Sequence, residues 1–287
     1  MTKQVVLYIH GIGVQNWGYA KQSIAKLKDA FIRNLIKKHP DINNTDLVCR
    51  EVLWAAKTGR AQANLLQKIN ETDDLRWNDL REFMVDFAGD VIAYHRSGKN
   101  SVYDEIHAEI TAQISFAINE CNSEDVELTF IAHSLGTVIV SDYLYDQSIN
   151  SESSENSITA TNLFTLGSPL AIWLLGLGDM SNANKPILVK RPNGVWVNII
   201  DNEDIIAYPL RNINSFYRQA VDKDLIAEVG LPQLPGLGPL SHMSYITDRN
   251  VIEPVAMKLA LDYERINGGV PFSKQAYFEY VDSIWNF

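Results

Sequence analysis

The sequence predicts a single α/β domain with a mostly parallel, doubly wound sheet and helices on both faces. Short apolar runs rich in β-branched residues alternate with longer segments of helical periodicity along the 287 residues, a pattern typical of parallel strands joined by crossover helices. Hydrophobic residues make up 46% of the chain, which is enough for a large core. No internal repeat or linker divides the sequence, so we expect one domain over residues 1–287.

The predicted strands are short and mostly apolar. Val5–Ile9 is a continuous apolar run that leads directly into His10-Gly11-Ile12-Gly13, as expected of a strand buried on both faces. Later strands are expected at 47–54, 126–132, 162–166 and 195–200. The stretch 204–242 lacks strong periodicity, and its 230–240 part holds three prolines and three glycines.

The predicted helices fill most of the intervening sequence. Residues 20–38 have an apolar face and stop before Pro40, which is typical of an amphipathic helix. Between the second and third strands the pattern is mostly helical, so a helical insertion is expected at about 55–121. Within it, helices are expected near 75–96 and 103–121, and further helices at 136–145 and 251–265.

The charge and the cysteine count limit the partners and the compartment. The chain has 25 Lys and Arg against 35 Asp and Glu, a net charge of −10, which disfavours nucleic acid and anionic lipid headgroups. Two cysteines, Cys49 and Cys121, indicate reduced thiols rather than a disulfide framework. The first apolar run is too short for a signal peptide, and no run is long enough for a transmembrane segment. We therefore expect a cytoplasmic protein.

The sharpest motif is Ala132-His133-Ser134-Leu135-Gly136, placed where a predicted strand turns into a helix. A nucleophilic serine at such a turn needs small residues two positions before and two after it. Ala132 and Gly136 meet this need, although the strict pattern has glycine at both positions. The alternative is an ordinary turn in which Ser134 caps the helix.

The loop after the first strand offers an oxyanion hole. The backbone N–H groups of Ile12 and Leu135 are the predicted donors, the second at the positive end of the helix that follows Ser134. Phosphate binding is the competing interpretation of this loop. It would need a glycine at the position of Asn16, and no acidic residue stands at the expected distance.

Six histidines are candidates for the base. His242 is favoured because it lies in a late, irregular loop before the last predicted helix, where the chain returns to the carboxyl edge of the sheet. His10 belongs to the glycine loop and His133 is expected to brace the serine turn. The remaining histidines, at positions 39, 95 and 107, have no motif around them.

The orienting acid should follow the strand at 195–200 and precede the histidine. Asp201, Glu203 and Asp204 all qualify by position. Asp204 is favoured because it lies beyond the strand end, whereas Asp201 is suited to capping the turn and Glu203 is expected to point outward. A buried carboxylate there would hold the imidazole tautomer and stabilise the imidazolium.

With these pieces the chain resembles the α/β-hydrolase superfamily, and within it small bacterial lipases and esterases, over roughly residues 4–265. The matching segments are His10-Gly11-Ile12-Gly13, Ala132-His133-Ser134-Leu135-Gly136, Leu166-Gly167-Ser168-Pro169, Asp204 and Ser241-His242. The resemblance implies Ser134 as nucleophile, His242 as general base and Asp204 as its orienter, with Ile12 and Leu135 at the oxyanion hole. The chain order Ser, Asp, His is the one this fold uses.

The substrate side is expected in two apolar segments, 170–185 and 211–240, which could serve as lid or pocket walls; Ile172, Trp173 and Leu237 are the predicted substrate-binding residues. The alternative is a helix packed on the sheet and a rigid surface loop. No metal-ligand spacing occurs, so neither a metal nor a cofactor is expected.

The predicted activity is hydrolysis of a small-molecule or lipid-like carboxylic ester with an apolar acyl group, through an acyl-enzyme. A thioesterase or acyltransferase would use the same residues. A catalytically silent interaction module is the alternative from another class, and the sequence does not predict an oligomeric state.

Overall fold

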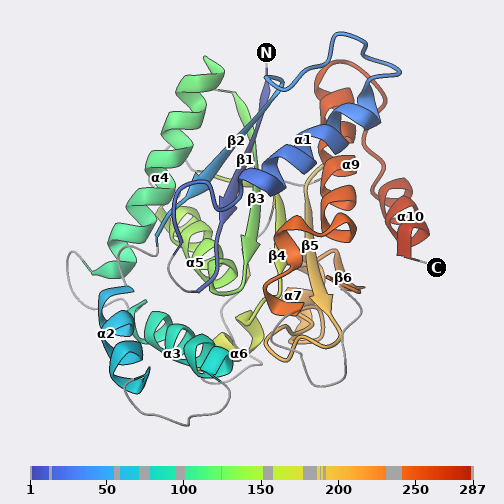
Figure 1. Cartoon of the computed structure of the whole chain (residues 1–287). Coiled ribbons are helices and arrows are strands. Elements are labelled where there is room, and N and C mark those ends of the chain that lie inside the picture. Colours follow the sequence, from blue (N-terminus) through green and yellow to red (C-terminus); the bar gives the residue numbers. More distant parts are fainter. Residues whose placement is uncertain are drawn as a thin grey trace.

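A parallel sheet of six strands forms the centre of the molecule (Figure 1). The computed structural model describes residues 2–12, 15–54, 59–70, 78–94, 101–123, 125–150, 158–176, 186–187, 189, 192–230 and 241–285. The strands are β1 (Lys3–Ile9), β2 (Leu47–Val52), β3 (Val126–His133), β4 (Ala160–Leu166), β5 (Val195–Asp201) and β6 (Lys223–Ala227). Their spatial order is β2-β1-β3-β4-β5-β6, and every pairing is parallel. The predicted α/β class is confirmed, and the architecture is consistent with an α/β-hydrolase-like fold.

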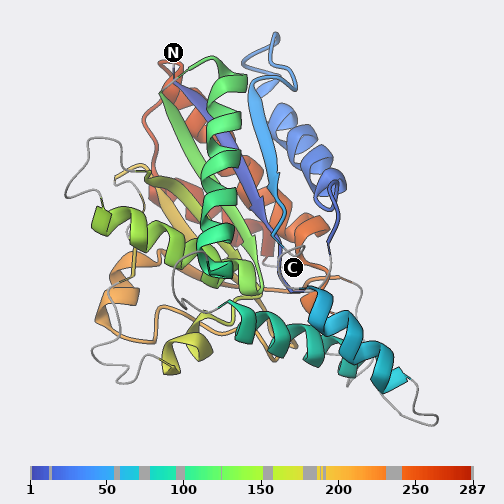
Figure 2. The same cartoon turned by 90° about the vertical axis from the view of Figure 1, so that its left-hand side faces the viewer.

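Helices cover both faces of this sheet. One face carries α1 (Lys21–Leu35) and α9 (Arg249–Ile266), and the other carries α4 (Val102–Cys121) and α5 (Leu135–Asn150) (Figures 1 and 2). The other described helices are α2 (Gly59–Asn70), α3 (Asn78–Ala93), α6 (Leu170–Leu175), α7 (Ser215–Ala220), α10 (Lys274–Trp285) and the short 3-10 turn η3 (Tyr245–Thr247).

The apolar run of the first strand is explained by burial on both sides. Val5, Leu7 and Ile9 belong to the core under α4 and α5, whereas Val6 and Tyr8 belong to the core under α1 and α9. Successive side chains of a strand point to opposite faces, so a strand between two helical layers must be apolar at nearly every position.

The helical insertion expected at 55–121 covers fewer residues in the structure, because its last helix is part of the layer that covers the sheet. Helix α4 packs against β1 and β2, with Ile106, Ile110 and Ile114 buried, and is therefore the crossover helix between β2 and β3. Helices α2 and α3 pack on each other beyond the carboxyl ends of the strands (Figure 2). These two helices therefore lie outside the layers that cover the sheet.

The stretch 204–242 lacks strong periodicity in the sequence, yet part of it forms regular structure. This stretch contains α7 and the edge strand β6, whereas 231–240 lie outside the described residues. Strand β6 has the sequence Lys-Asp-Leu-Ile-Ala, and only its leucine and alanine are buried. Such a short, half-polar edge strand forms because β5 supplies hydrogen-bonding partners, which local periodicity does not reveal.

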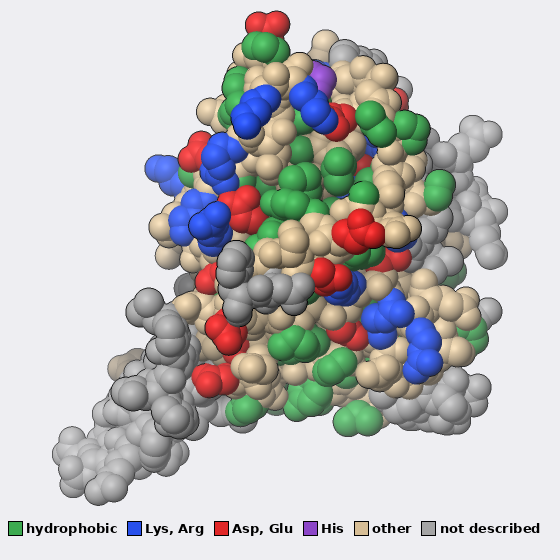
Figure 3. All heavy atoms as spheres, turned by 90° about the vertical axis from the view of Figure 1, so that its right-hand side faces the viewer, with side chains coloured by type: hydrophobic (Ala, Val, Ile, Leu, Met, Phe, Trp, Pro, Cys, Tyr) green, Lys and Arg blue, Asp and Glu red, His purple; other side chains and the backbone are tan. Residues whose placement is uncertain are grey.

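The C-terminal helix α10 was not predicted either. It packs on α9 and is joined to the β6 region by the ion pairs Lys274–Asp222, at 2.8 Å, and Lys223–Asp282. Figure 3 shows this side of the molecule, where charged side chains of both signs surround a hydrophobic patch.

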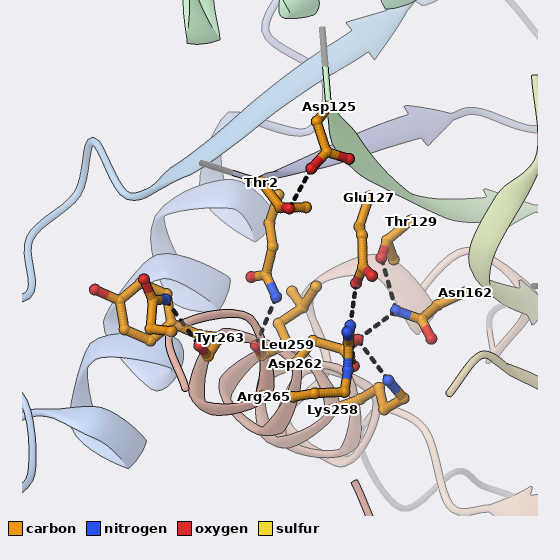
Figure 4. Close-up of polar contacts among 12 residues, drawn as sticks. Thr2, Asp125, Glu127, Thr129, Asn162, Lys258, Leu259, Asp262, Tyr263 and Arg265 are labelled. Carbon is orange, nitrogen blue, oxygen red and sulfur yellow. Dashed lines mark hydrogen bonds and ion pairs between the residues drawn. The ribbon is translucent and has the colours of Figure 1, made fainter. Parts of the chain in front are cut away.

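A buried ionic network joins α9 to the amino ends of the central strands (Figure 4). Asp262 accepts from Lys258 Nζ at 2.5 Å and from Asn162 Nδ2 at 2.9 Å, and Arg265 bridges Asp262 and Glu127. Burial lowers the pKa of Lys258, although the Asp262 carboxylate opposes that change. The network therefore lies at the amino ends of the strands, whereas the predicted site lies at their carboxyl ends.

Candidate active site

The predicted site residues converge at the carboxyl ends of the strands. The strand order reverses between β1 and β3, and in open α/β sheets ligands bind beside such a reversal. The loop after β1 and the turn after β3 meet there, because a Cβ added to Gly11 would lie only 2.5 Å from the Cβ of Ser134. Glycine at position 11 therefore permits this close approach.

Ser134 occupies a sharp turn between β3 and α5. Its φ is +52°, a left-handed conformation that is costly for a residue other than glycine, and its N–H donates to the carbonyl of Leu166 at 2.9 Å. A Cβ on Gly136 would meet the carbonyl oxygen of His10 at 2.5 Å, whereas Ala132 is accommodated in full burial. The turn thus needs glycine after the serine but accepts alanine before it.

A hydrogen-bonded chain joins Ser134, His242 and Asp204. His242 Nε2 lies 2.8 Å from Ser134 Oγ, and His242 Nδ1 lies 2.8 Å from Asp204 Oδ2. A carboxylate only accepts, so Nδ1 carries the proton and Nε2 is left to accept from the serine hydroxyl. Ser134 and His242 are fully buried, so the hydrogen bond between them is shielded from water.

Asp204 is held in its ionised form by several donors. Burial alone would raise its pKa, but the hydrogen bond and charge of His242, the N–H of Ile206 and the hydroxyl of Tyr245 together lower it. The Ile206 N–H lies 2.9 Å from Oδ1, and the Tyr245 hydroxyl 2.9 Å from Oδ2. This environment favours a carboxylate next to the imidazole.

Asp201 has a different role. Its carboxylate accepts from the N–H of Glu203 at 2.9 Å and from the N–H of Val229 at 2.7 Å. It therefore caps the turn after β5 and ties that turn to the segment after β6. Glu203 is exposed, as expected, and of the three acids only Asp204 contacts His242 in the described structure.

His10 and His133 support the loops of the site. His10 Nδ1 donates to the Gly11 carbonyl at 2.7 Å, and its Nε2 accepts from the N–H of Trp54 at 3.2 Å. His133 Nε2 donates to the backbone carbonyl of His242 at 2.6 Å. Burial lowers the pKa of His10 to about 4 and that of His133 to about 3. Both rings are therefore neutral, and the bracing expected of His133 acts on the His242 loop.

The two predicted oxyanion donors are backbone N–H groups of the two segments that approach each other at Gly11 and Ser134. Leu135 is the first residue of α5, so its N–H is among those that find no partner within the helix. Ile12 follows Gly11, which touches Ser134, and no hydrogen bond involves its N–H within the described part of the chain. The roles of both groups stay predictions.

The predicted substrate residues lie on α6 or outside the described residues. Ile172 is 40% exposed, and Trp173 is partly buried beside Tyr94, with the ring centroids 5.9 Å apart. Leu237 and residues 177–185 are outside the described ranges. A small cavity next to the site is lined instead by Ile12, Met243 and other residues of the β1 loop and the His242 segment. A substrate role for α6 stays a prediction.

Two contacts of the site were missed by sequence reasoning. Tyr245 bonds Asp204, and Gly167, with φ +55°, leaves room for the Tyr245 ring and for His242. Gly167 was visible in the sequence as the glycine after a strand. Glycine is needed there because a Cβ would contact side chains that lie far along the chain. Nothing around Tyr245 in the sequence indicates its partner 41 positions earlier.

The described residues contain neither a metal-binding cluster nor a membrane-spanning helix. Among the described residues, no three His, Cys, Asp or Glu side chains gather in an arrangement that could hold a metal ion. No helix in the described ranges is both long and apolar enough to span a bilayer.

Comparisons with known proteins identify no family. No family model matches the chain, and no curated protein matches it. Among solved structures, it is similar to phospholipase PlaB from Legionella pneumophila, with a TM-score of 0.30 and 14% identity over 62% of this chain and 29% of PlaB. The same phospholipase in complex with thio-NAD gives a TM-score of 0.28 at the same identity and coverage. Similarity this low indicates nothing about activity, so the functional interpretation rests on the geometry of the site.

Proposed function

We propose that this chain is a serine hydrolase that cleaves a carboxylic ester with an apolar acyl group through an acyl-enzyme intermediate. Ser134 is the nucleophile, His242 the general base and Asp204 the acid that orients it. The observation that carries the proposal is the unbroken hydrogen-bonded chain from Asp204 through His242 to Ser134, with 2.8 Å at each link. The left-handed backbone of Ser134 adds support, because a strained turn is typical of a nucleophile held at a strand–helix junction.

In the first step Ser134 Oγ attacks the ester carbonyl carbon while His242 Nε2 takes the hydroxyl proton. The imidazolium that forms donates through Nδ1 to the ionised Asp204, which stabilises the positive charge. Because these groups are buried, little solvent reorganises as charge develops. The attraction between the imidazolium and the Asp204 carboxylate is also stronger than it would be in water.

The carbonyl oxygen becomes an oxyanion in the tetrahedral intermediate. The N–H groups of Ile12 and Leu135 donate to it, the second from the positive end of α5. His242 then returns the proton to the departing alcohol, and the C–O bond breaks to leave the acyl group on Ser134. Water attacks the acyl-enzyme by the same route and releases the carboxylic acid.

An apolar acyl group fits the surroundings of the triad. Ile205 follows Asp204 and is 68% exposed, and Met243 follows His242 and is 53% exposed. Exposed apolar side chains around a polar reaction centre favour contact with hydrocarbon. Ile172 on α6 and Leu237 are the proposed further contacts.

The proposal is tested by labelling with a fluorophosphonate, which reacts with an activated serine. The wild-type protein should label, whereas Ser134→Ala should not label and should lose ester turnover by at least about a thousandfold with its fold intact. Ser141→Ala is the matched control. Ser141 lies on α5 and is buried, as Ser134 is, but it does not belong to the triad. Wild-type protein that never labels would contradict the serine hydrolase proposal.

A panel of p-nitrophenyl esters and acyl-thioesters then defines the substrate. The ratio kcat/KM should rise with acyl length up to a limit, and truncation of Ile172 or Trp173 to alanine should lower that limit. A kcat/KM that does not change with acyl length would contradict the proposal of an apolar acyl pocket. Faster turnover of thioesters than of esters would favour a thioesterase.

A further inference from the structure

Tyr245 connects several parts of the candidate site through one hydroxyl group. It lies in η3, three residues after His242, and is fully buried. Its hydroxyl is 2.7 Å from the backbone nitrogen of Asp201 and 2.9 Å from Asp204 Oδ2. We propose that Tyr245 is a positioning residue that fixes the Asp204 carboxylate and limits how much of its charge reaches His242, an inference that rests on the proposed function.

The direction of these hydrogen bonds follows from the groups involved. The backbone N–H of Asp201 can only donate, so the Tyr245 oxygen accepts there. The hydroxyl proton is then free to point at Asp204, whose carboxylate only accepts. The Asp201 N–H thus orients the hydroxyl, and the hydroxyl donates to the same oxygen, Oδ2, that accepts from His242.

The tyrosine ring is fully buried and closely packed at this position. A Cβ on Gly167 would lie 2.9 Å from the Tyr245 ring and 3.1 Å from Asp204 Oδ2, so the ring fills the space that glycine leaves. The other carboxylate oxygen, Oδ1, accepts from the N–H of Ile206 at 2.9 Å. With donors on both oxygens, the carboxylate cannot rotate without losing a hydrogen bond.

The hydroxyl also has an electrostatic effect on the triad. A donor to Oδ2 draws negative charge toward the tyrosine, so less of it acts on the imidazolium that forms during attack. Without this donor, Asp204 would hold a protonated His242 more strongly while being less firmly oriented. The two consequences predict different changes in kinetics, which makes the role measurable.

The test is Tyr245→Phe, which removes one oxygen and keeps the ring. We expect kcat to fall roughly ten- to a hundredfold, the range for a hydrogen bond to a charged group, with KM nearly unchanged. The acid limb of the pH profile of kcat/KM should move to higher pH, because the imidazole keeps its proton more readily. Tyr277→Phe is the matched control: Tyr277 is also fully buried, but its hydroxyl donates to the Pro254 carbonyl, away from the site.

A second measurement needs no turnover. In a Ser134→Ala background, the downfield proton resonance of His242 Nδ1–H should shift when Tyr245→Phe is added and should stay in place with Tyr277→Phe. An unmoved acid limb together with an unmoved resonance would overturn the inference, even if kcat fell through general destabilisation. If wild-type protein failed to label with a fluorophosphonate, the proposed function would fail, while the resonance would still decide whether Tyr245 acts on the Asp204–His242 pair.

Discussion

Single residues of the same type have different roles in this site because of what each one contacts. Asp201 and Asp204 lie three positions apart, yet Asp201 accepts only from backbone N–H groups in the described structure, whereas Asp204 accepts from His242. The sequence favoured Asp204 because it follows the end of the strand. It did not predict the donors that hold the carboxylate, since Tyr245 reaches Asp204 only in the folded chain.

We predict that Asp204→Asn lowers kcat by roughly 10³- to 10⁴-fold while the fold is kept. An asparagine amide can donate to Nδ1, which favours the imidazole tautomer that cannot accept the serine proton. Asp201→Asn should instead lower the free energy of unfolding by about 1–3 kcal/mol with kcat nearly unchanged, because one backbone N–H loses its acceptor. Kinetics and urea unfolding of both variants check this; equal losses of kcat would give Asp201 a catalytic role.

At the scale of helices and strands, sequence periodicity predicted the elements whose own apolar face packs into the core. The apolar run of β1 and the i, i+4 isoleucines of α4 both identify surfaces packed in the core. Strand β6 and helix α10 were missed because β6 depends on pairing with β5 and α10 on packing against α9. Helix α9 was predicted, but its ionic contacts with the amino ends of the strands were not.

We predict that Asp262→Ala, on α9, lowers the free energy of unfolding by about 3–5 kcal/mol, because it leaves the buried Lys258 ammonium without its partner. The Phe272 ring, 4.2 Å from Lys258 Nζ, replaces only part of that interaction. Arg249→Ala on the same helix is the control. It removes a solvent-exposed arginine from an i, i+4 pair with Glu253 and should change stability by less than about 1 kcal/mol.

Chemical denaturation of both α9 variants gives these values, and fluorophosphonate labelling should be unchanged in each below its unfolding midpoint. Similar stabilities of the two variants would show that the buried network contributes little to the fold.

At the scale of the whole molecule, two buried neutral histidines make the fold sensitive to acid. The pKa values of His10 and His133 are lowered by burial to about 4 and about 3, from an ordinary value of 6.5. As the pH falls below about 6.5, the unfolded chain binds protons that the folded protein excludes, so stability is lost until the folded pKa is reached. Asp204, whose pKa is already low, adds its own loss only in more acidic solution.

We predict that the free energy of unfolding falls by roughly 3–4 kcal/mol between pH 7 and pH 5, close to 2 kcal/mol for each histidine. Urea unfolding at a series of pH values measures the slope. His133→Asn should remove about half of the pH dependence, whatever its effect on stability at pH 7. A stability that stays constant over this interval would mean that the two rings bind protons in the folded protein as readily as in the unfolded chain.

The amino-acid sequence is sufficient to predict the α/β class, most of the strands and the serine turn, because these depend on periodicity and on small residues at short spacing. It also placed Ser134, Asp204 and His242 in loops at one edge of the sheet, since the carboxyl ends of parallel strands share that edge. The folded structure is needed to see that His242 lies 2.8 Å from both Ser134 Oγ and Asp204 Oδ2, that Tyr245 donates to Asp204 and that β6 completes the sheet. Such contacts join residues far apart along the chain, and hydrogen bonding and packing select them only once the layers have come together.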